Sequence, residues 1–298
     1  MPTTPRTRGL VLIAALALLW GSNFLWIALA LRAFTPAELT FGRMLLGALV
    51  LLPVVFLRRE RLPRDPGTWG YLAVAGLISN AAPYLLFALG ETRVSSGVAG
   101  AINATTPLWT LALVILLRQE QRPTPAKAAG FALGFVGCTV MFSPWQTDGI
   151  DTRGGLYCLG AALCYALSYL YMARYLTHRK ISLVTLSAGQ LITATLWTVP
   201  ALLISHEPGI GTAPEAWTAL LILGLLGTGA AYVINYALVR TEGASGASVV
   251  TYVVPLVSLT LGAVFANEIV SGAIITGAAL VLLGVAMTRR SAPRPVTR

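Results

Sequence analysis

Apolar stretches of about 20 residues recur along the whole chain, and short segments rich in proline, glycine and arginine separate them. A helix of this length spans the hydrocarbon layer of a membrane. Hydrophobic residues make up 56% of the 298 positions and charged residues 11%, whereas about a quarter of a soluble domain is charged. The pattern predicts an all-α integral membrane protein that leaves no room for a soluble domain.

The apolar stretches divide into ten predicted transmembrane helices with short connections. Thr35-Pro36 and Thr124-Pro125 are typical starts, because threonine caps a helix N-terminus and proline fits its first turn. The predicted helices cover residues 9–31, 36–57, 68–89, 95–117, 124–142, 154–174, 182–204, 215–238, 244–266 and 269–288.

The positive charges predict the orientation, since cytoplasmic loops carry an excess of Lys and Arg. If the N-terminus is cytoplasmic, 17 of the 21 Lys and Arg residues fall in inside segments, 3 fall in outside loops and Arg43 lies within a helix. Both termini are therefore predicted to be cytoplasmic, which requires an even number of helices. This topology explains the formal net charge of +10, and no nucleic acid partner is expected.

Sequence patterns of the first half return in the second half at an offset of 145–149 residues. Phe41-Gly42-Arg43 aligns with Ala188-Gly189-Gln190, and Trp69, Gly76 and Tyr84 align with Trp217, Gly224 and Tyr232. Each half then holds five helices, so the second half starts on the opposite side of the membrane. We therefore expect two inverted repeats, at residues 1–146 and 147–298, around a central cavity, as in many secondary transporters.

Two of the predicted helices carry a proline near the middle and polar residues beside it. Residues 95–120 hold Pro107, and residues 244–268 hold Pro255 at the same distance from a final glutamate. Proline removes one N–H and leaves the carbonyl four residues earlier without its helical partner. In lipid such a carbonyl needs another partner or a water-filled cavity. The paired interruptions predict a binding site near the membrane midplane between these two helices.

Polar and aromatic residues at helical spacing form the predicted substrate-binding site. The predicted substrate-binding residues are Trp20, Asn23, Asn80, Tyr84, Asn103, Thr106, Pro107, Tyr165, Ser168, Tyr232, Asn235, Thr251, Pro255 and Ser258. An aromatic wall beside amide and hydroxyl groups suits an apolar or aromatic solute with a polar handle. Core packing and hydrogen bonding between helices are the alternative roles for these side chains.

Arg43 is the only formal charge clearly inside a predicted helix. An ionisable residue within the membrane is by default a functional hypothesis. Its place about 10 Å from the outer end of the helix favours a structural role, in which it snorkels or ties helix ends together. Capture of a substrate carboxylate is the alternative. No Asp or Glu lies deep within a predicted helix, which favours a facilitator or exchanger over a proton-coupled carrier.

Glycines at helical spacing mark the fifth and tenth predicted helices. They are Gly130, Gly134 and Gly137 in one helix, and Gly277 and Gly284 in the other. Small residues let two helices approach closely. Packing within the monomer is the favoured interpretation, and a homodimer interface is the alternative.

Several of these motifs resemble the EamA family of the drug/metabolite transporter superfamily. The resemblance rests on WGSNF at 20–24, FGRML at 41–45, the SSG…P pattern at 95–107, and the glutamates Glu120 and Glu268. It implies a ten-helix inner-membrane carrier with a central cavity lined by helices 1, 3, 4, 6, 8 and 9, and many such carriers export amino acids or related metabolites. The second half departs from the pattern, since Gln190 replaces Arg43 and the sixth helix lacks a WGSNF-like string, which leaves the substrate open.

Together these features predict a multi-pass inner-membrane secondary transporter that moves a small metabolite, such as an amino acid, outward by alternating access. The direction follows only from the resemblance. A passive channel, or the same scaffold carrying a nucleobase, sugar or drug, is the alternative. An enzyme is not expected, because the sequence shows no metal-ligand cluster, nucleophile–base set or deep acid pair. The expected partners are the substrate and the lipid bilayer, with no cofactor and no metal.

Overall fold

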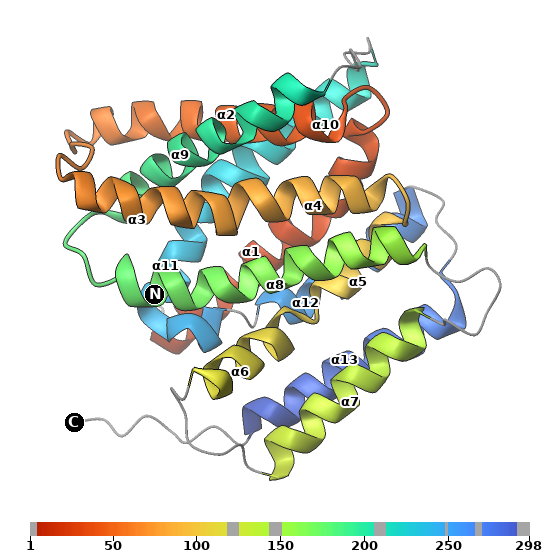
Figure 1. The fold of residues 1–298 in the computed structure, drawn as a ribbon. Helices are drawn as coiled ribbons and strands as arrows, with labels where there is room; N and C mark the ends of the chain where they lie inside the picture. The colour runs from red at the N-terminus through yellow and green to blue at the C-terminus, as the bar shows by residue number, and fades with distance from the viewer. Residues whose placement is uncertain are drawn as a thin grey trace.

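The computed structural model describes residues 5–117, 125–142, 151–205, 213–247, 250–265 and 270–290, and all regular structure in these ranges is helical (Figure 1). The first half contains α1 (Pro5–Ala30), α2 (Pro36–Leu57), α3 (Pro66–Gly76), the π-helical segment η1 (Leu77–Ala81), α4 (Ala82–Glu91), α5 (Ser96–Asn103), α6 (Thr106–Leu116) and α7 (Pro125–Phe142). The second half contains α8 (Thr152–Tyr175), α9 (Leu183–Ile204), α10 (Pro214–Gly224), the π-helical segment η2 (Leu225–Ala230), α11 (Ala231–Ala247), α12 (Val250–Phe265) and α13 (Gly272–Arg290). Each of the ten predicted segments overlaps at least one of these helices.

Seven stretches of helix in the described part of the chain are long and apolar enough to cross a membrane. They are Val11–Ala30, Pro36–Leu57, Pro66–Glu91, Ser96–Leu116, Thr152–Tyr175, Leu183–Ile204 and Pro214–Thr241. Two shorter apolar helices, Val253–Phe265 and Gly272–Gly284, follow them. Large apolar side chains also lie on the outer surface, where Leu57 is 83% and Leu116 is 76% exposed. The protein is therefore a multi-pass membrane protein whose outer surface suits contact with lipid.

Capping side chains set where several helices begin. The Thr35 hydroxyl accepts a hydrogen bond from the backbone N–H of Glu38 at 3.3 Å, and the Glu38 carboxylate accepts one from the N–H of Thr35 at 2.8 Å. This reciprocal pair satisfies two N–H groups that have no partner within the helix. Ser95 and Ser182 cap α5 and α9 with their hydroxyl groups. For this reason the starts predicted at residues 36, 95 and 182 agree with the structure to within one residue.

Two predicted segments differ from the expectation. Residues 95–117 do not form one kinked helix but two helices, because the chain turns at Ala104 and Thr105 and Pro107 lies in the first turn of α6. The connection expected at residues 239–243 is also wrong, since α11 continues as a helix to Ala247. That stretch contains no proline, so no residue there forces the helix to end.

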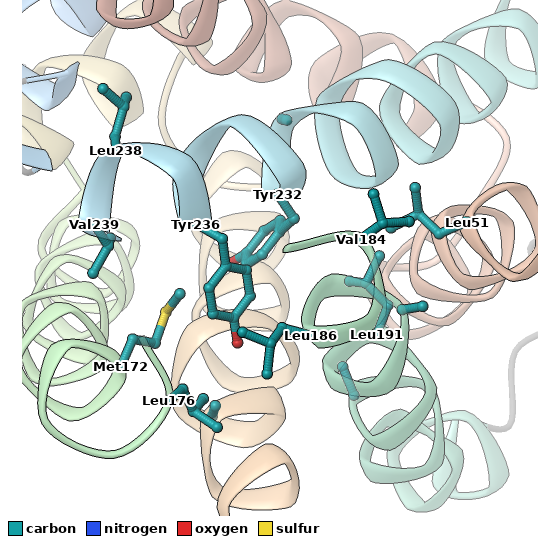
Figure 2. Close-up of a cluster of buried hydrophobic side chains, with 14 of the residues drawn as sticks. Leu51, Met172, Leu176, Val184, Leu186, Leu191, Tyr232, Tyr236, Leu238 and Val239 are labelled. Carbon is teal, nitrogen blue, oxygen red and sulfur yellow. The ribbon is translucent and has the colours of Figure 1, made fainter. Parts of the chain in front are cut away.

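Buried side chains from both halves pack around α9 and α11. Tyr232 and Tyr236 of α11 lie beside Leu186 of α9, with Met172 of α8 and Leu51 of α2 in the same cluster (Figure 2). Each of these side chains is 5% exposed or less. The two tyrosines bring polar hydroxyl groups into this core, and a buried hydroxyl needs a hydrogen-bond partner.

Close contacts between the two halves come in corresponding pairs. In each contact a glycine of one half meets a side chain of the other half. The pairs are Gly42 with Leu220, Gly189 with Leu72, Gly76 with Thr193, and Gly224 with Leu46. The first two pairs correspond to each other at the sequence offset of the repeat, and so do the last two. As a result α2 packs against α10 and η2 in the same way as α9 packs against α3 and η1.

Helices α7 and α13 lie side by side at one edge of the molecule (Figure 1). A Cβ atom at Gly137 would lie 2.7 Å from the carbonyl oxygen of Gly277 and 2.8 Å from the nitrogen of Val281. A Cβ atom at Gly284 would lie 2.7 Å from the nitrogen of Gly134. Backbones can approach this closely only where no side chain intervenes. The predicted role of the glycine stripes in packing within the monomer is confirmed.

Candidate functional site

A narrow cavity lies among helices of both halves. Its lining combines aromatic rings, polar side chains and one charged side chain from α1, α2, α4, α5, α8 and α12. The lining residues are Trp20, Asn23, Phe24, Ile27, Arg43, Tyr84, Phe87, Asn103, Tyr165 and Thr251. The volume open to the centre of a water molecule is about 20 Å³, which is room for one water molecule or little more. A small organic solute therefore enters only if the surrounding side chains or helices move apart.

Six of the fourteen predicted site residues line this cavity. They are Trp20, Asn23, Tyr84, Asn103, Tyr165 and Thr251. No three His, Cys, Asp or Glu side chains of the described residues lie close enough together to hold a metal ion. The groups that the cavity offers to a ligand are aromatic rings, amides, hydroxyl groups, an indole N–H and a guanidinium.

The other eight predicted site residues are buried but do not line the cavity. They are Asn80, Thr106, Pro107, Ser168, Tyr232, Asn235, Pro255 and Ser258. The Ser168 hydroxyl donates to the Tyr165 carbonyl at 2.8 Å, and the Ser258 hydroxyl donates to the Pro255 carbonyl at 3.2 Å. In this conformation such side chains take part in packing and local hydrogen bonds, which is the alternative role that the sequence left open.

Aromatic rings form much of the cavity wall. The Trp20 and Tyr165 rings are nearly parallel, with 10° between their planes and 6.4 Å between their centroids. The Tyr165 ring centroid also lies 5.9 Å from that of Phe87 and 6.3 Å from that of Tyr84. Phe24 packs edge-on against Phe87 at 5.2 Å. Such rings present a large apolar surface, so the wall suits an apolar or aromatic group.

Arg43 is the charged residue of the lining and is 2% exposed. Its Nε donates to the Thr228 hydroxyl at 3.2 Å, and its guanidinium carbon lies 3.8 Å from the centre of the Tyr84 ring. When the Asn23 amide is oriented with its oxygen toward Arg43, the oxygen accepts from Nη2 of Arg43 at 3.3 Å and the nitrogen donates to the Leu19 carbonyl at 3.1 Å, which satisfies both ends of the amide. Arg43 thus joins α1, α2, α4 and η2 and also faces the cavity.

The position of Arg43 corrects the sequence-based interpretation. Snorkelling to the membrane surface is wrong, because the side chain is buried against Thr228 and Tyr84. The helix that carries it also lines the cavity, which the family resemblance did not lead us to expect. The signals in the sequence were its status as the one charge within a predicted helix and its place in the FGRML string at 41–45. The apolar lining residues Phe24, Ile27 and Phe87 were not predicted, since on an apolar helix they resemble residues that face lipid.

The broken stretch of residues 95–117 brings the end of α5 to the cavity. Asn103 is the last residue of α5, and its Oδ1 accepts a hydrogen bond from the Thr106 hydroxyl at 3.3 Å. Because Pro107 has no N–H, the carbonyl of Asn103 loses its helical partner. Helix α5 also packs against α12, where a Cβ atom at Gly100 would lie 2.5 Å from the Cβ of Ser258. The two proline-bearing stretches therefore contact each other beside the cavity, although neither proline lines it.

The two π-helical segments carry matching polar contacts. Asn80 lies in η1, and its Oδ1 accepts a hydrogen bond from Nε2 of Gln190 at 2.6 Å. Thr228 lies in η2 and accepts from Arg43. At the repeat offset Gln190 corresponds to Arg43, and Asn80 corresponds to Thr228. π-Helical turns are rare and occur often at functional sites, and no pattern in the sequence predicted them.

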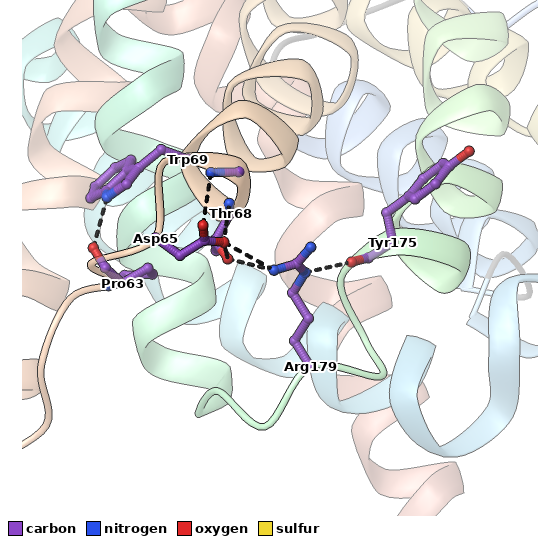
Figure 3. Close-up of polar contacts among 7 residues, drawn as sticks. Pro63, Asp65, Thr68, Trp69, Tyr175 and Arg179 are labelled. Carbon is purple, nitrogen blue, oxygen red and sulfur yellow. Dashed lines mark hydrogen bonds and ion pairs between the residues drawn. The ribbon is translucent and has the colours of Figure 1, made fainter.

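A second polar cluster joins the α2–α3 loop to the α8–α9 loop (Figure 3). The Nη1 of Arg179 lies 3.6 Å from the Asp65 carboxylate and donates to the Thr68 hydroxyl. The Nε of Arg179 donates to the Tyr175 carbonyl at 3.0 Å. The cluster connects the first half of the chain to the second at the Arg-rich end of the molecule.

Two carboxyl groups near this cluster, those of Asp65 and Glu60, have lowered pKa values. Hydrogen bonds from the Thr68 hydroxyl and from the N–H groups of Thr68 and Gly67, together with the charge of Arg179, lower the pKa of Asp65 below its ordinary value of 3.8. Burial raises the pKa of Glu60, but hydrogen bonds from two hydroxyl groups and the charge of a nearby arginine outweigh it and lower the pKa. The two hydroxyl donors to Glu60 are Ser182 and Thr185.

Replacing Asp65 with asparagine is expected to lower the thermal midpoint of the purified protein at pH 7, because it removes the charge that faces Arg179. The pKa of Asp65 is depressed in the folded state, so its contribution is present above the ordinary value of 3.8 and is lost as the pH falls through the lowered pKa. Melting in detergent from pH 7 to pH 3 should show the difference between wild type and variant disappearing below about pH 4. An equal difference in melting temperature at pH 7 and at pH 3 would show that the charge of Asp65 does not stabilise the fold.

Comparison with known proteins gives matches over nearly the whole chain. The model of the EamA-like transporter family matches residues 7–143 and again residues 152–290. "Uncharacterized transporter YvbV" of Bacillus subtilis is 27% identical over 294 residues, which cover 96% of this chain and 93% of that protein. "Probable terminal-alkyne amino-acid exporter" of Streptantibioticus cattleyicolor is 28% identical over 277 residues, which cover 91% of this chain and 90% of that protein.

A solved crystal structure has the same fold. It superimposes on this chain with a TM-score of 0.70 at 20% sequence identity, and the match covers 95% of this chain and 98% of that one. At this level of identity the likeness concerns the arrangement of the helices and carries no information on the substrate.

Proposed function

Since the chain belongs to the EamA-like transporter family, we propose that it is a secondary transporter that moves a small metabolite across the inner membrane by alternating access. The observation that carries this proposal is the cavity, which side chains of both halves line with aromatic, amide and guanidinium groups. An apolar wall with a few polar groups is typical of binding sites for small organic molecules.

The two halves, residues 1–146 and 147–298, are proposed to be inverted repeats of five membrane-crossing helices each. The family model matches each half once. The paired glycine contacts and the hydrogen bonds of Arg43 and Gln190 recur at the same offset, which supports a pseudo-two-fold relation between the halves. The excess of Lys and Arg on one side supports cytoplasmic termini.

The size of the cavity supports alternating access, because a volume of about 20 Å³ does not admit a metabolite. Rocking of the two halves about their paired glycine contacts would open the cavity to one side at a time. The contact between Asp65 and Arg179 joins the halves at the end that the charge distribution assigns to the cytoplasm. In this scheme the contact breaks when the cavity opens inward.

An amino acid is the proposed cargo, and export is the proposed direction. One relative at 28% identity is named "Probable terminal-alkyne amino-acid exporter". The cavity wall offers aromatic rings for a side chain and Asn23, Asn103 and Arg43 for polar groups. A nucleobase, a sugar or a drug carries polar groups that differ from the carboxylate and ammonium of an amino acid, and the same cavity wall would have to bind those instead.

Proteoliposomes that contain the purified protein provide the test. Liposomes preloaded with an unlabelled amino acid should take up labelled amino acid by saturable counterflow, and a panel of nucleobases and sugars tests the other cargoes. A bidirectional leak without saturation or counterflow would show a channel and contradict the proposal.

The substitutions Trp20→Ala and Asn103→Ala should each slow counterflow about tenfold or more without loss of folded protein, since each removes a group from the cavity wall. Leu196→Ala is the control, because this side chain is 66% exposed on the outer surface. Normal counterflow by both cavity variants would show that the site lies elsewhere.

A further inference from the structure

We propose that the substrate carries a carboxylate group and that Arg43 binds it. The inference rests on the proposed transporter function, because it describes what the same cavity selects. The expected substrates are small carboxylates with an apolar or aromatic body, and amino acids with apolar side chains belong to this class.

The guanidinium of Arg43 is buried among neutral groups. The side chain is 2% exposed, and its contacts are the Thr228 hydroxyl, the Asn23 amide and the Tyr84 ring. Among the described residues, no carboxylate oxygen lies within 4.0 Å of it. A guanidinium stays charged in a protein, and a buried charge is stable only when it is paired or well hydrogen-bonded. A substrate anion would supply the missing negative charge.

The contacts of Arg43 hold the guanidinium in one orientation and leave donors available. Of its five N–H groups, one donates to Thr228 and one to Asn23 within the described ranges. The Tyr84 ring covers one flat face of the group at 3.8 Å. A further partner therefore approaches along the edge of the guanidinium. Two N–H groups along such an edge match the two oxygen atoms of a carboxylate.

A second donor of the cavity wall is also without an acceptor. The indole N–H of Trp20 is buried and has no hydrogen-bond partner in the part of the chain that the structure describes. An indole N–H can only donate, so it needs an acceptor from a ligand or from water. Trp20 and Arg43 line the same cavity, and an acceptor-rich anion bound there would suit both.

The remaining lining favours an apolar body and leaves a place for an ammonium group. The rings of Phe24, Phe87 and Tyr165 face the cavity. Helix α5 ends at Asn103, whose carbonyl loses its helical partner at Pro107 and can accept a hydrogen bond from an ammonium group. The carboxylate and the ammonium of an amino acid would then bind at Arg43 and Asn103, with the side chain against the rings.

The competing role for Arg43 is a purely structural tie between helices. Under that role the cavity has no reason to distinguish a carboxylate from the corresponding neutral amide. Under the proposed role an amide in place of the substrate carboxylate brings no negative charge, so the buried Arg43 guanidinium stays unpaired. The cavity therefore rejects the amide.

Counterflow in proteoliposomes separates the two roles. The carboxylate probes are L-phenylalanine, L-leucine, L-methionine and 3-phenylpropanoate, and the non-carboxylate probes are L-phenylalaninamide, uracil and glucose. Wild-type protein should exchange at least one carboxylate probe, and L-phenylalaninamide should compete with it about 10- to 100-fold less well than L-phenylalanine. Equal competition by acid and amide, or saturable exchange of neutral probes alone, would overturn the inference and leave the transporter function standing. Absence of saturable exchange with every probe would overturn both.

Variants of Arg43 then assign the selectivity to this residue. Arg43→Gln should remove the preference for the acid over the amide, whereas Arg43→Lys keeps the charge and should retain part of the preference. Thermal melting shows whether each variant is folded. If Arg43→Gln does not fold, competition by the acid and by the amide is compared between wild-type protein and Arg43→Lys. This comparison still decides whether Arg43 selects the carboxylate. A folded Arg43→Gln variant with unchanged preference would overturn the assignment.

Discussion

Replacing Gly284 with alanine is expected to force α13 away from α7 and to destabilise the protein strongly. The added Cβ atom would lie 2.7 Å from the backbone nitrogen of Gly134 and 3.1 Å from its Cα. Backbone atoms cannot rotate away as the end of a side chain can, so the two helices must separate. Overpacking of this kind typically costs about 1–3 kcal/mol, and we expect the upper end of that range because the clash is with backbone.

The thermal midpoint of the purified protein in detergent measures this effect. Gly272→Ala is the matched control, because Gly272 starts the same helix and a Cβ atom there meets nothing within 4 Å. The control should melt at or above the wild-type temperature, since alanine is a better helix former than glycine. Equal melting of Gly284→Ala and Gly272→Ala would show that α7 and α13 do not pack through this glycine.

Replacing Gln190 with leucine is expected to destabilise the protein by leaving two buried polar groups without partners. The Gln190 side chain donates to Oδ1 of Asn80 at 2.6 Å and accepts from the Tyr236 hydroxyl. Gln190, Asn80 and Tyr236 are all fully buried, at 0% exposure. A buried polar group that loses its partner costs about 1–3 kcal/mol, so we expect a loss of about 2–6 kcal/mol for the two groups.

Melting of Gln190→Leu beside Thr195→Val on the same helix provides the comparison. Within the described residues the Thr195 hydroxyl donates to the carbonyl of Leu191 in its own helix, so its removal leaves no side chain there unpaired. Thr195→Val should therefore melt close to wild type. If Gln190→Leu also melts close to wild type, the Asn80–Gln190–Tyr236 contact does not hold α9 against η1 and α11.

The layout of the helices could be predicted because it depends on properties of single segments. Each predicted range overlaps a helix, and capped starts such as Pro36 agree with the structure. The division of residues 95–117 into α5 and α6 could not be predicted in the same way. Pro107 removes one N–H whether the helix bends or breaks, so the proline alone does not distinguish the two outcomes. The contact of Gly100 with Ser258 of α12 involves a distant part of the chain, which a local pattern does not show.

The candidate site could be predicted only in part. Helical spacing placed Trp20 with Asn23 and marked Asn103, and all three line the cavity. The same spacing also selected Asn80, which instead bonds to Gln190 of α9. A helical pattern shows which residues share a face, but it does not show which neighbouring helix that face meets.

The amino-acid sequence by itself determined that the chain is a membrane protein, where its apolar helices lie and which residues recur in the second half. These are properties of composition and spacing, and each apolar helix satisfies its backbone hydrogen bonds alone. Only the tertiary structure decided that Arg43 shares a cavity with Trp20, Asn103 and Thr251. Their meeting depends on how closely the helices approach at the glycine contacts, and that distance is set by packing between segments far apart in the chain.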